Sequence, residues 1–156
     1  MSGNHRTFLS LLAALAISAT MTLAAGPAQA AASRPAQSAT AMSPELRAFD
    51  WARSQAGKPY IYGDTGPGGF DCSGLVMQAY RHAGIKLPRT TYEMLASPLL
   101  VRVSQPEKGD LAFYGSGHVE LYAHGDFTFG AHSSGQPVGW MEFGPWYHPT
   151  AYYRIR

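Results

Sequence analysis

Cys72 is the single cysteine of the 156-residue chain, and it stands in the run Gly69-Phe70-Asp71-Cys72-Ser73-Gly74. A glycine-rich segment precedes it and an apolar helical period follows, which places Cys72 at the first turn of a predicted helix. A helix N-terminus favours the thiolate, which is the nucleophilic form of cysteine. The pattern indicates a nucleophile. A buried, inert thiol is the alternative, and the polar neighbours Asp71 and Ser73 favour an accessible side chain.

Histidines that could accept the thiol proton follow downstream. His118 begins one predicted strand and His132 ends the next, so the two can be cross-strand neighbours in a hairpin. Such a pair can supply a base and the group that orients it. Each could equally be a structural histidine. His82 is expected on a solvated helix face, His124 in the hairpin turn and His148 in a loop.

One cysteine and two histidines could also bind zinc and leave a fourth position open. The chain has none of the CxxC, HxxxH or HExxH spacings that mark zinc sites. We therefore expect no metal and no cofactor.

The N-terminal segment is typical of a secretory signal peptide. An apolar run over 8–25 follows His5 and Arg6, and Ala28-Gln29-Ala30 is a small-residue cleavage signal. An uncleaved membrane anchor is the alternative, but serines and threonines dilute the run and Gly26-Pro27 ends it. We expect a signal peptide at 1–30, a flexible linker at 31–43 and one domain at 44–156. The mature protein would be secreted or cell-wall associated, without stable membrane insertion.

The domain shows helical periods first and strand periods afterwards. Helices are expected from Ser43 to a cap at Gly57, from Cys72 to Gly84 and from Thr90 to Ala96. Short strands are expected over 99–103, 110–114, 118–123, 127–131, 138–143 and 151–155. Helices followed by strands predict an α+β fold with an antiparallel sheet. The net charge is only +2, and the chain has no run of Lys and Arg, so nucleic acid is not an expected partner. We expect a monomer.

Five ordered motifs span about Trp51 to Tyr122, and together they resemble the NlpC-type cell-wall cysteine peptidases (the NlpC/p-sixty family). They are Gly57-Lys58-Pro59-Tyr60-Ile61-Tyr62-Gly63, Gly69-Phe70-Asp71-Cys72-Ser73-Gly74-Leu75-Val76, Leu87-Pro88-Arg89-Thr90-Thr91, Lys108-Gly109-Asp110-Leu111-Ala112-Phe113-Tyr114 and Gly117-His118-Val119-Glu120-Leu121-Tyr122.

The resemblance implies a papain-like α+β domain in which Cys72 is the nucleophile, at a helix N-terminus, and His118 is the base. A third polar residue, usually histidine, holds the base, and here His132 is assigned to that role. Tyr60 matches a tyrosine that helps to bind the oxyanion or the substrate, and Asp71 and Ser73 match polar flanks of the substrate groove.

Three positions depart from the family pattern. The third polar residue usually follows the base by about a dozen residues, where this chain has Gly130, so that His132 comes two residues later. A glycine commonly follows the His-Val pair, and here that position is Glu120. A glutamine often found after the Pro-Arg motif is replaced by Met94.

The implied function is hydrolysis of peptidoglycan stem peptides, at the bond between γ-D-glutamyl and diaminopimelate or lysine, through a Cys-His-His thiolate mechanism. Lys58, Arg53 or Arg89 could hold a stem-peptide carboxylate, or could be solvated surface charges. Two other functions remain open: an N-acetylmuramoyl-L-alanine amidase with the same thiol chemistry, and a non-catalytic wall-binding module.

Overall fold

The computed structural model describes residues 42–156, and these residues form three helices followed by six strands. The helices are α1 (Pro44–Arg53), α2 (Cys72–His82) and α3 (Thr91–Leu95). The strands are β1 (Leu100–Val103), β2 (Leu111–Tyr114), β3 (His118–His124), β4 (Phe127–Gly130), β5 (Gly139–Glu142) and β6 (Ala151–Ile155). The predicted order of helices before strands is confirmed.

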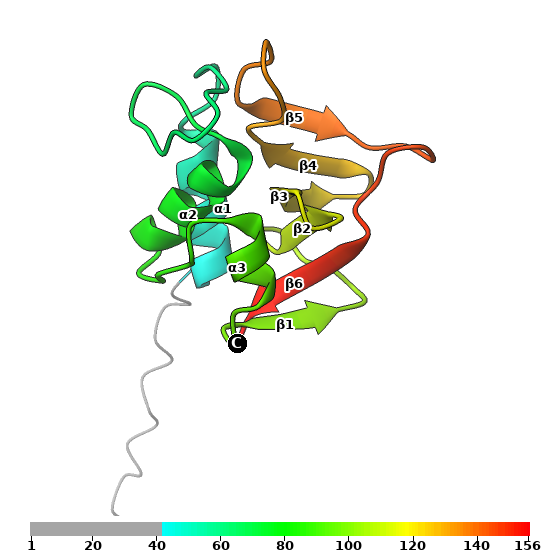
Figure 1. The fold of residues 1–156 in the computed structure, drawn as a ribbon. Coiled ribbons are helices and arrows are strands. Elements are labelled where there is room, and N and C mark those ends of the chain that lie inside the picture. Colours follow the sequence, from blue (N-terminus) through cyan, green and yellow to red (C-terminus); the bar gives the residue numbers. More distant parts are fainter. Residues whose placement is uncertain (1–41) are drawn as a thin grey trace, which may run out of the picture. The chain divides into compact units, whose positions relative to one another are not determined.

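All six strands join one antiparallel sheet in the order β1-β6-β2-β3-β4-β5. Figure 1 shows the three helices on the same side of this sheet, with the last strand, β6, inserted between β1 and β2. The C-terminal strand β6 therefore connects β1 to the rest of the sheet. Strands β2 and β3 are interior strands, each with a neighbour on both sides. The fold is α+β, as the sequence predicted.

The helix starts follow from local capping. The Ser43 side chain accepts a hydrogen bond from the Leu46 amide, and Pro44 fills the first turn of α1. Thr90 and Glu93 form a reciprocal capping box on α3. α1 ends at Arg53, four residues before the predicted cap at Gly57. The chain continues there in hydrogen-bonded turns until Gly57, whose φ of 85° suits glycine.

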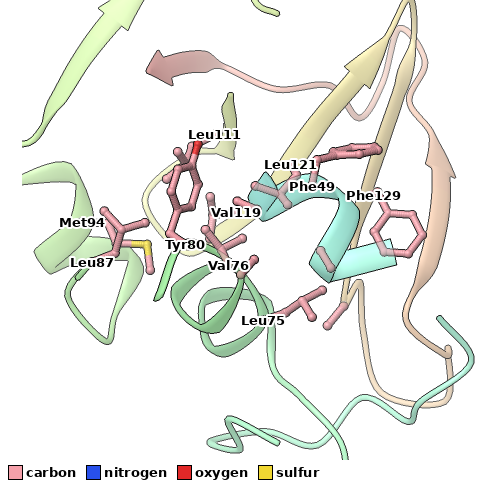
Figure 2. Packing of buried hydrophobic residues seen from close by; sticks show 14 of the residues in the cluster. Phe49, Leu75, Val76, Tyr80, Leu87, Met94, Leu111, Val119, Leu121 and Phe129 are labelled. Atoms are coloured by element: carbon pink, nitrogen blue, oxygen red, sulfur yellow. The ribbon is translucent and has the colours of Figure 1, made fainter. Parts of the chain in front are cut away.

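The hydrophobic core lies between the helices and the sheet (Figure 2). Leu75 and Val76 of α2 point toward the sheet, where Val119 and Leu121 of β3 are fully buried. Because side chains alternate along a strand, His118 and Glu120 lie on the opposite face of β3. The core thus fixes β3 in the register that carries the site residues.

Among residues 42–156, none of the helices has the length and apolarity that a membrane crossing requires. The signal peptide expected at 1–30 and nearly all of the linker expected at 31–43 lie outside the described residues.

Candidate active site

Cys72 is the first residue of α2, and Asp71 fixes it there. The Asp71 carboxylate caps the helix by accepting a hydrogen bond from the Gly74 amide at 2.6 Å. Gly74 lets the helix start approach the preceding loop, because a Cβ at this position would lie 2.3 Å from the Asp64 carbonyl oxygen. Cys72 is only 8% exposed, so it is more buried than its polar neighbours led us to expect.

Asp71 and Ser73 are also buried, and both are bound by Arg89. The Arg89 guanidinium donates to both Asp71 carboxylate oxygens at 3.1 and 2.5 Å, and to the Ser73 hydroxyl at 2.9 Å. The hydrogen bonds and the charge of Asp71 raise the pKa of Arg89, although burial opposes them. Asp71 and Ser73 still line the hollow beside Cys72, but their polar atoms are committed to Arg89. Arg89 is therefore a structural cation in this state, which the sequence alone did not show.

We expect Asp71→Ala to lower the free energy of unfolding by about 2–3 kcal/mol. The variant loses a helix N-cap, worth about 1 kcal/mol, together with charge-assisted hydrogen bonds to a one-third exposed guanidinium. Asp71→Asn is the matched control, because asparagine also caps helices, and it should cost about 1 kcal/mol. Urea unfolding of both variants tests this, and equal losses would contradict a separate contribution from Arg89.

His118 begins β3 and faces both Cys72 and Glu120. Its Nε2 lies 3.1 Å from Glu120 Oε1. Burial lowers the pKa of His118, but hydrogen bonds with Cys72 and Glu120 and the charges of both groups outweigh burial and raise this pKa to about 9. The imidazole is thus held between the thiol and a carboxylate, as a base paired with a nucleophile requires.

Glu120 is fully buried, and both of its carboxylate oxygens have hydrogen-bond partners. Oε1 lies 3.1 Å from His118 Nε2 and 3.1 Å from His132 Nδ1. Oε2 accepts a hydrogen bond from the Thr128 hydroxyl at 2.6 Å, and Thr128 is in turn 3.0 Å from the Tyr114 hydroxyl. Burial would raise the pKa of Glu120, but the hydrogen bonds from His118, His132 and Thr128 hold it below its ordinary value. Glu120 is therefore an ionised carboxylate inside the protein.

His132 lies beside His118, but Glu120 stands between their polar atoms. The two rings meet edge to face with centroids 5.6 Å apart. The hydrogen bond of His132 goes to Glu120 Oε1 rather than to His118. The hairpin brings the two histidines together, as expected. An orienting role for His132 implied a direct hydrogen bond to His118. In the structure each histidine is instead hydrogen-bonded to Glu120.

The other histidines of the described part of the chain lie elsewhere. His82 is exposed and stacks on Trp51, His124 is exposed at the end of β3, and His148 is exposed in the loop before β6. None of the three is among the partners of Cys72 or Glu120.

His118, Glu120 and His132 also offer ligand atoms within 4.8 Å of one another, a spacing compatible with a metal ion. Hydrogen bonds account for this cluster, because an ionised carboxylate accepts from both imidazoles and from Thr128. We assign no metal to it.

A hollow of about 460 Å³ opens beside the thiol and the imidazole. Tyr60, Tyr62 and Tyr92 line it together with Cys72 and His118. Burial raises the pKa of Tyr60, and the nearby charges of Cys72 and Asp71 add to this effect. The phenol therefore keeps its proton and can donate to an anion formed next to Cys72. Tyr60 therefore lines the hollow with Cys72, and the oxyanion or substrate role that the resemblance implied for it stays a prediction.

A family model described as the NlpC/P60 family matches residues 57–154, which include every residue of this site. The chain belongs to the NlpC/P60 family. In sequence it is 42% identical over 102 residues to a probable endopeptidase of Corynebacterium glutamicum, covering 64% of this chain and 49% of that protein. It is 41% identical over 88 residues to the probable endopeptidase p60 of Listeria monocytogenes, covering 54% and 18%. The chain thus spans about half or less of the length of these NlpC/P60 relatives.

Solved structures of the same family share the fold. The NlpC/p60 domain of the peptidoglycan hydrolase SagA superposes with a TM-score of 0.63 at 28% identity, covering 71% of this chain and 98% of that one. The peptidoglycan hydrolase RipB of Mycobacterium tuberculosis gives a TM-score of 0.62 at 29% identity, covering 72% and 65%. The family match in sequence is therefore accompanied by a match in structure, and the described residues have the α+β architecture of NlpC/P60 domains.

Proposed function

We propose that this protein is a cysteine endopeptidase that cleaves peptidoglycan stem peptides. The observation that carries the proposal is the pairing of Cys72, at the N-terminus of α2, with the imidazole of His118 beside an open hollow. Relatives named as probable endopeptidases and structural neighbours named as peptidoglycan hydrolases support the substrate class. The bond proposed is the one between γ-D-glutamyl and diaminopimelate or lysine.

The arrangement supports a two-step acyl transfer. The Cys72 thiol gives its proton to His118, so the two groups enter the reaction as a thiolate–imidazolium pair, and the thiolate attacks the scissile carbonyl carbon to form a tetrahedral oxyanion. The Tyr60 hydroxyl and the Cys72 amide would stabilise that oxyanion, and one such donor is typically worth roughly 3 kcal/mol. The His118 imidazolium then protonates the leaving amine, which leaves a thioester on Cys72.

Hydrolysis of the thioester repeats the proton transfers in reverse. Neutral His118 accepts a proton from water, the hydroxide adds to the thioester carbonyl, and the carbon–sulfur bond breaks. The imidazolium returns its proton to the thiolate, or shares it as an ion pair, and the new carboxylate leaves. No other reactant is needed.

Recognition of a stem-peptide carboxylate is not assigned to Arg89. Both carboxylate oxygens of Asp71 and the Ser73 hydroxyl occupy its guanidinium. Lys58 points its ammonium at Gln55 and lies over the ring of Phe70. The exposed aromatic rings of Tyr62 and Tyr92 at the hollow instead offer apolar and stacking surface to a substrate.

Digestion of purified peptidoglycan with the 31–156 protein tests the activity and the bond together. We expect muropeptide mass spectrometry to show a dipeptide left on muramic acid. Release of whole stem peptides, with muramic acid residues in the glycan that carry no peptide, would instead indicate an amidase. Intact muropeptides would contradict enzymatic activity and favour a wall-binding module.

We also propose that residues 1–30 direct export and that the mature protein acts at the cell wall. The apolar run and the Ala28-Gln29-Ala30 site support this. Expression of the whole chain followed by N-terminal sequencing of the secreted product checks it, with Ala31 expected as the first residue. Retention of uncleaved chain in the membrane would contradict the proposal.

Activity is expected to fall as the pH rises through about 9. The pKa of His118 is raised to about 9, so the imidazolium persists below this pH and can protonate the leaving amine. Above it His118 is neutral, and the acid required for amine departure is lost. A profile of kcat/KM between pH 5 and 10.5, on a soluble muropeptide, checks the position of this basic limb. A basic limb near 6.5 would contradict the pairing with Cys72 and Glu120.

A further inference from the structure

We propose that Glu120 is the residue that positions the base, with its carboxylate holding His118 toward Cys72. This inference deepens the proposed function and rests on it. Three independent features of the structure support it: the direction of the hydrogen bonds, the space beside Gly130 and the burial of an anion.

The hydrogen-bond directions fix the tautomer of His118. An ionised carboxylate only accepts, so the 3.1 Å contact between His118 Nε2 and Glu120 Oε1 requires a proton on Nε2. Nδ1 of His118 is then the nitrogen with a free lone pair in the neutral ring, and it is available to the Cys72 thiol. Glu120 thereby selects the tautomer that can act as base.

Further hydrogen bonds fix the carboxylate itself. The Thr128 hydroxyl donates its single proton to Glu120 Oε2, so the Tyr114 hydroxyl must donate to Thr128. These residues come from β2, β3 and β4, which are neighbours in the sheet. A carboxylate held at both oxygens in the sheet interior is a rigid support for an imidazole, as groups behind a base must be.

Gly130 provides the space for the Glu120 side chain. The register of β3 and β4 pairs Leu121 with Phe129, and its continuation puts Glu120 opposite Gly130. A Cβ at position 130 would lie 2.6 Å from Glu120 Cγ and 2.8 Å from its Cδ. A side chain at 130 would therefore enter the volume that Glu120 fills. The two departures from the family pattern, Glu120 in place of glycine and Gly130 in place of a polar residue, are thus coupled. The polar side chain that contacts the base comes from β3 instead of β4.

Glu120 and Cys72 are the charged groups that act directly on His118. Cys72 faces His118 from α2, Glu120 from β3 and His132 from the segment after β4. Tyr114 of β2 lies against His118 with ring centroids 5.5 Å apart, and Tyr147 stacks on Tyr114. Both tyrosines have raised pKa values because of burial, so they are neutral over the working range. Removal of the Glu120 charge should therefore change the proton affinity of His118 directly.

The arrangement gives His132 a secondary position. Its Nδ1 donates to the Oε1 atom that His118 also uses, so it holds the carboxylate rather than the base. Tyr147 packs edge-on against His132, with ring centroids 5.7 Å apart, from the loop between β5 and β6. We expect substitution of His132 to reduce turnover less than truncation of Glu120.

Substitution of Glu120 provides the first test. Glu120→Gln keeps the shape and an acceptor for His118 but removes the charge, so the basic limb of kcat/KM should move below pH 9 by about one unit or more. Glu120→Ala should reduce kcat by about 10²–10³-fold, within the range for residues that orient a catalytic histidine, with KM little changed. Glu142→Gln, on the exposed edge of the same sheet, is the control and should leave rate and profile unchanged.

The exchange with Gly130 provides the second test. Gly130→His alone should reduce kcat about as much as Glu120→Ala, because the new side chain displaces Glu120. In the Glu120→Gly background the space is free, and addition of Gly130→His should raise kcat at least tenfold over Glu120→Gly alone. Circular dichroism and thermal unfolding of each variant would separate loss of the fold from loss of positioning.

The outcomes distinguish failure of this inference from failure of the proposed function. If the parent protein leaves peptidoglycan intact, the proposed function fails, and the pH dependence of Cys72 alkylation by iodoacetamide still reports on Glu120. An unchanged profile in folded Glu120→Gln, or a His132→Ala loss exceeding that of Glu120→Ala, would overturn the positioning role. Activity lost in EDTA would do so as well, because the carboxylate would then serve a metal.

Discussion

Replacement of Cys72 by alanine is expected to abolish peptidoglycan hydrolysis, with kcat lower by at least about 10⁴-fold, the scale seen when a catalytic nucleophile is removed. Without sulfur there is no group that can form the acyl intermediate. Cys72→Ser should be almost as inactive, because the hydroxyl is a much weaker nucleophile in a site arranged for a thiol. Release of soluble muropeptides, measured by chromatography and mass spectrometry, checks both variants.

The cost of these variants in stability should be small. Alanine removes only the sulfur atom of Cys72, so although this residue is only 8% exposed the void is small, and we expect a loss of about 1 kcal/mol or less in the free energy of unfolding. Thermal unfolding confirms that an inactive variant is folded. A folded Cys72→Ala protein that digests peptidoglycan at the parental rate would refute the thiol mechanism.

Most of the fold was predictable because its signals are local. Ser43-Pro44-Glu45 and Thr90 with Glu93 are capping sequences, and the structure shows helices starting at both. The six strands are bounded by turn residues that the sequence shows, although β2 is buried along its whole length and does not alternate. The end of α1 was misplaced because Gly57 closes a series of turns rather than the helix itself. The order of strands in the sheet, with β6 beside both β1 and β2, depends on long-range pairing that no local pattern contains.

The site was predicted in part, and the missing part is instructive. Cys72, His118 and Tyr60 were placed by motif and do line the same hollow. Glu120 and Gly130 were noted as two separate departures from the family pattern. The hairpin register that puts His118 opposite His132 also puts Glu120 opposite Gly130, which could have linked the two positions. What the sequence could not show is that the Glu120 side chain reaches the imidazole, since this depends on burial and on Thr128.

The partners of Arg89 were missed for a different reason. An arginine after a Leu-Pro pair has no local signal for an ion pair with Asp71, which lies 18 positions earlier. Its effect is indirect but relevant to activity, because Asp71 caps the helix that carries Cys72. The charged groups near the thiol therefore fall into two pairs: Asp71 with Arg89 stabilises the start of α2, and Glu120 with His118 lies where proton transfer is proposed. The sequence alone does not distinguish these two pairs.

Removal of the imidazole at position 118 is expected to reduce kcat by about 10³-fold or more, because the thiol loses its base and the leaving amine its acid. His118→Ala should also slow alkylation of Cys72 near neutral pH, since the imidazolium with a pKa of about 9 stabilises the thiolate in the parent protein. Alkylation does not require substrate, so this measurement separates activation of the thiol from binding of peptidoglycan.

The fold of this variant needs its own control, because His118→Ala leaves the buried Glu120 carboxylate with one donor fewer. His118→Gln retains a donor that can reach Glu120 and should fold more stably while remaining inactive. His124→Ala is the matched histidine control: His124 is exposed at the far end of the same strand, so both kcat and alkylation should stay at the parental level. If folded His118→Gln and the parent were alkylated alike across pH, His118 would not be coupled to the thiol, and the base would have to be sought among the other polar groups at the hollow.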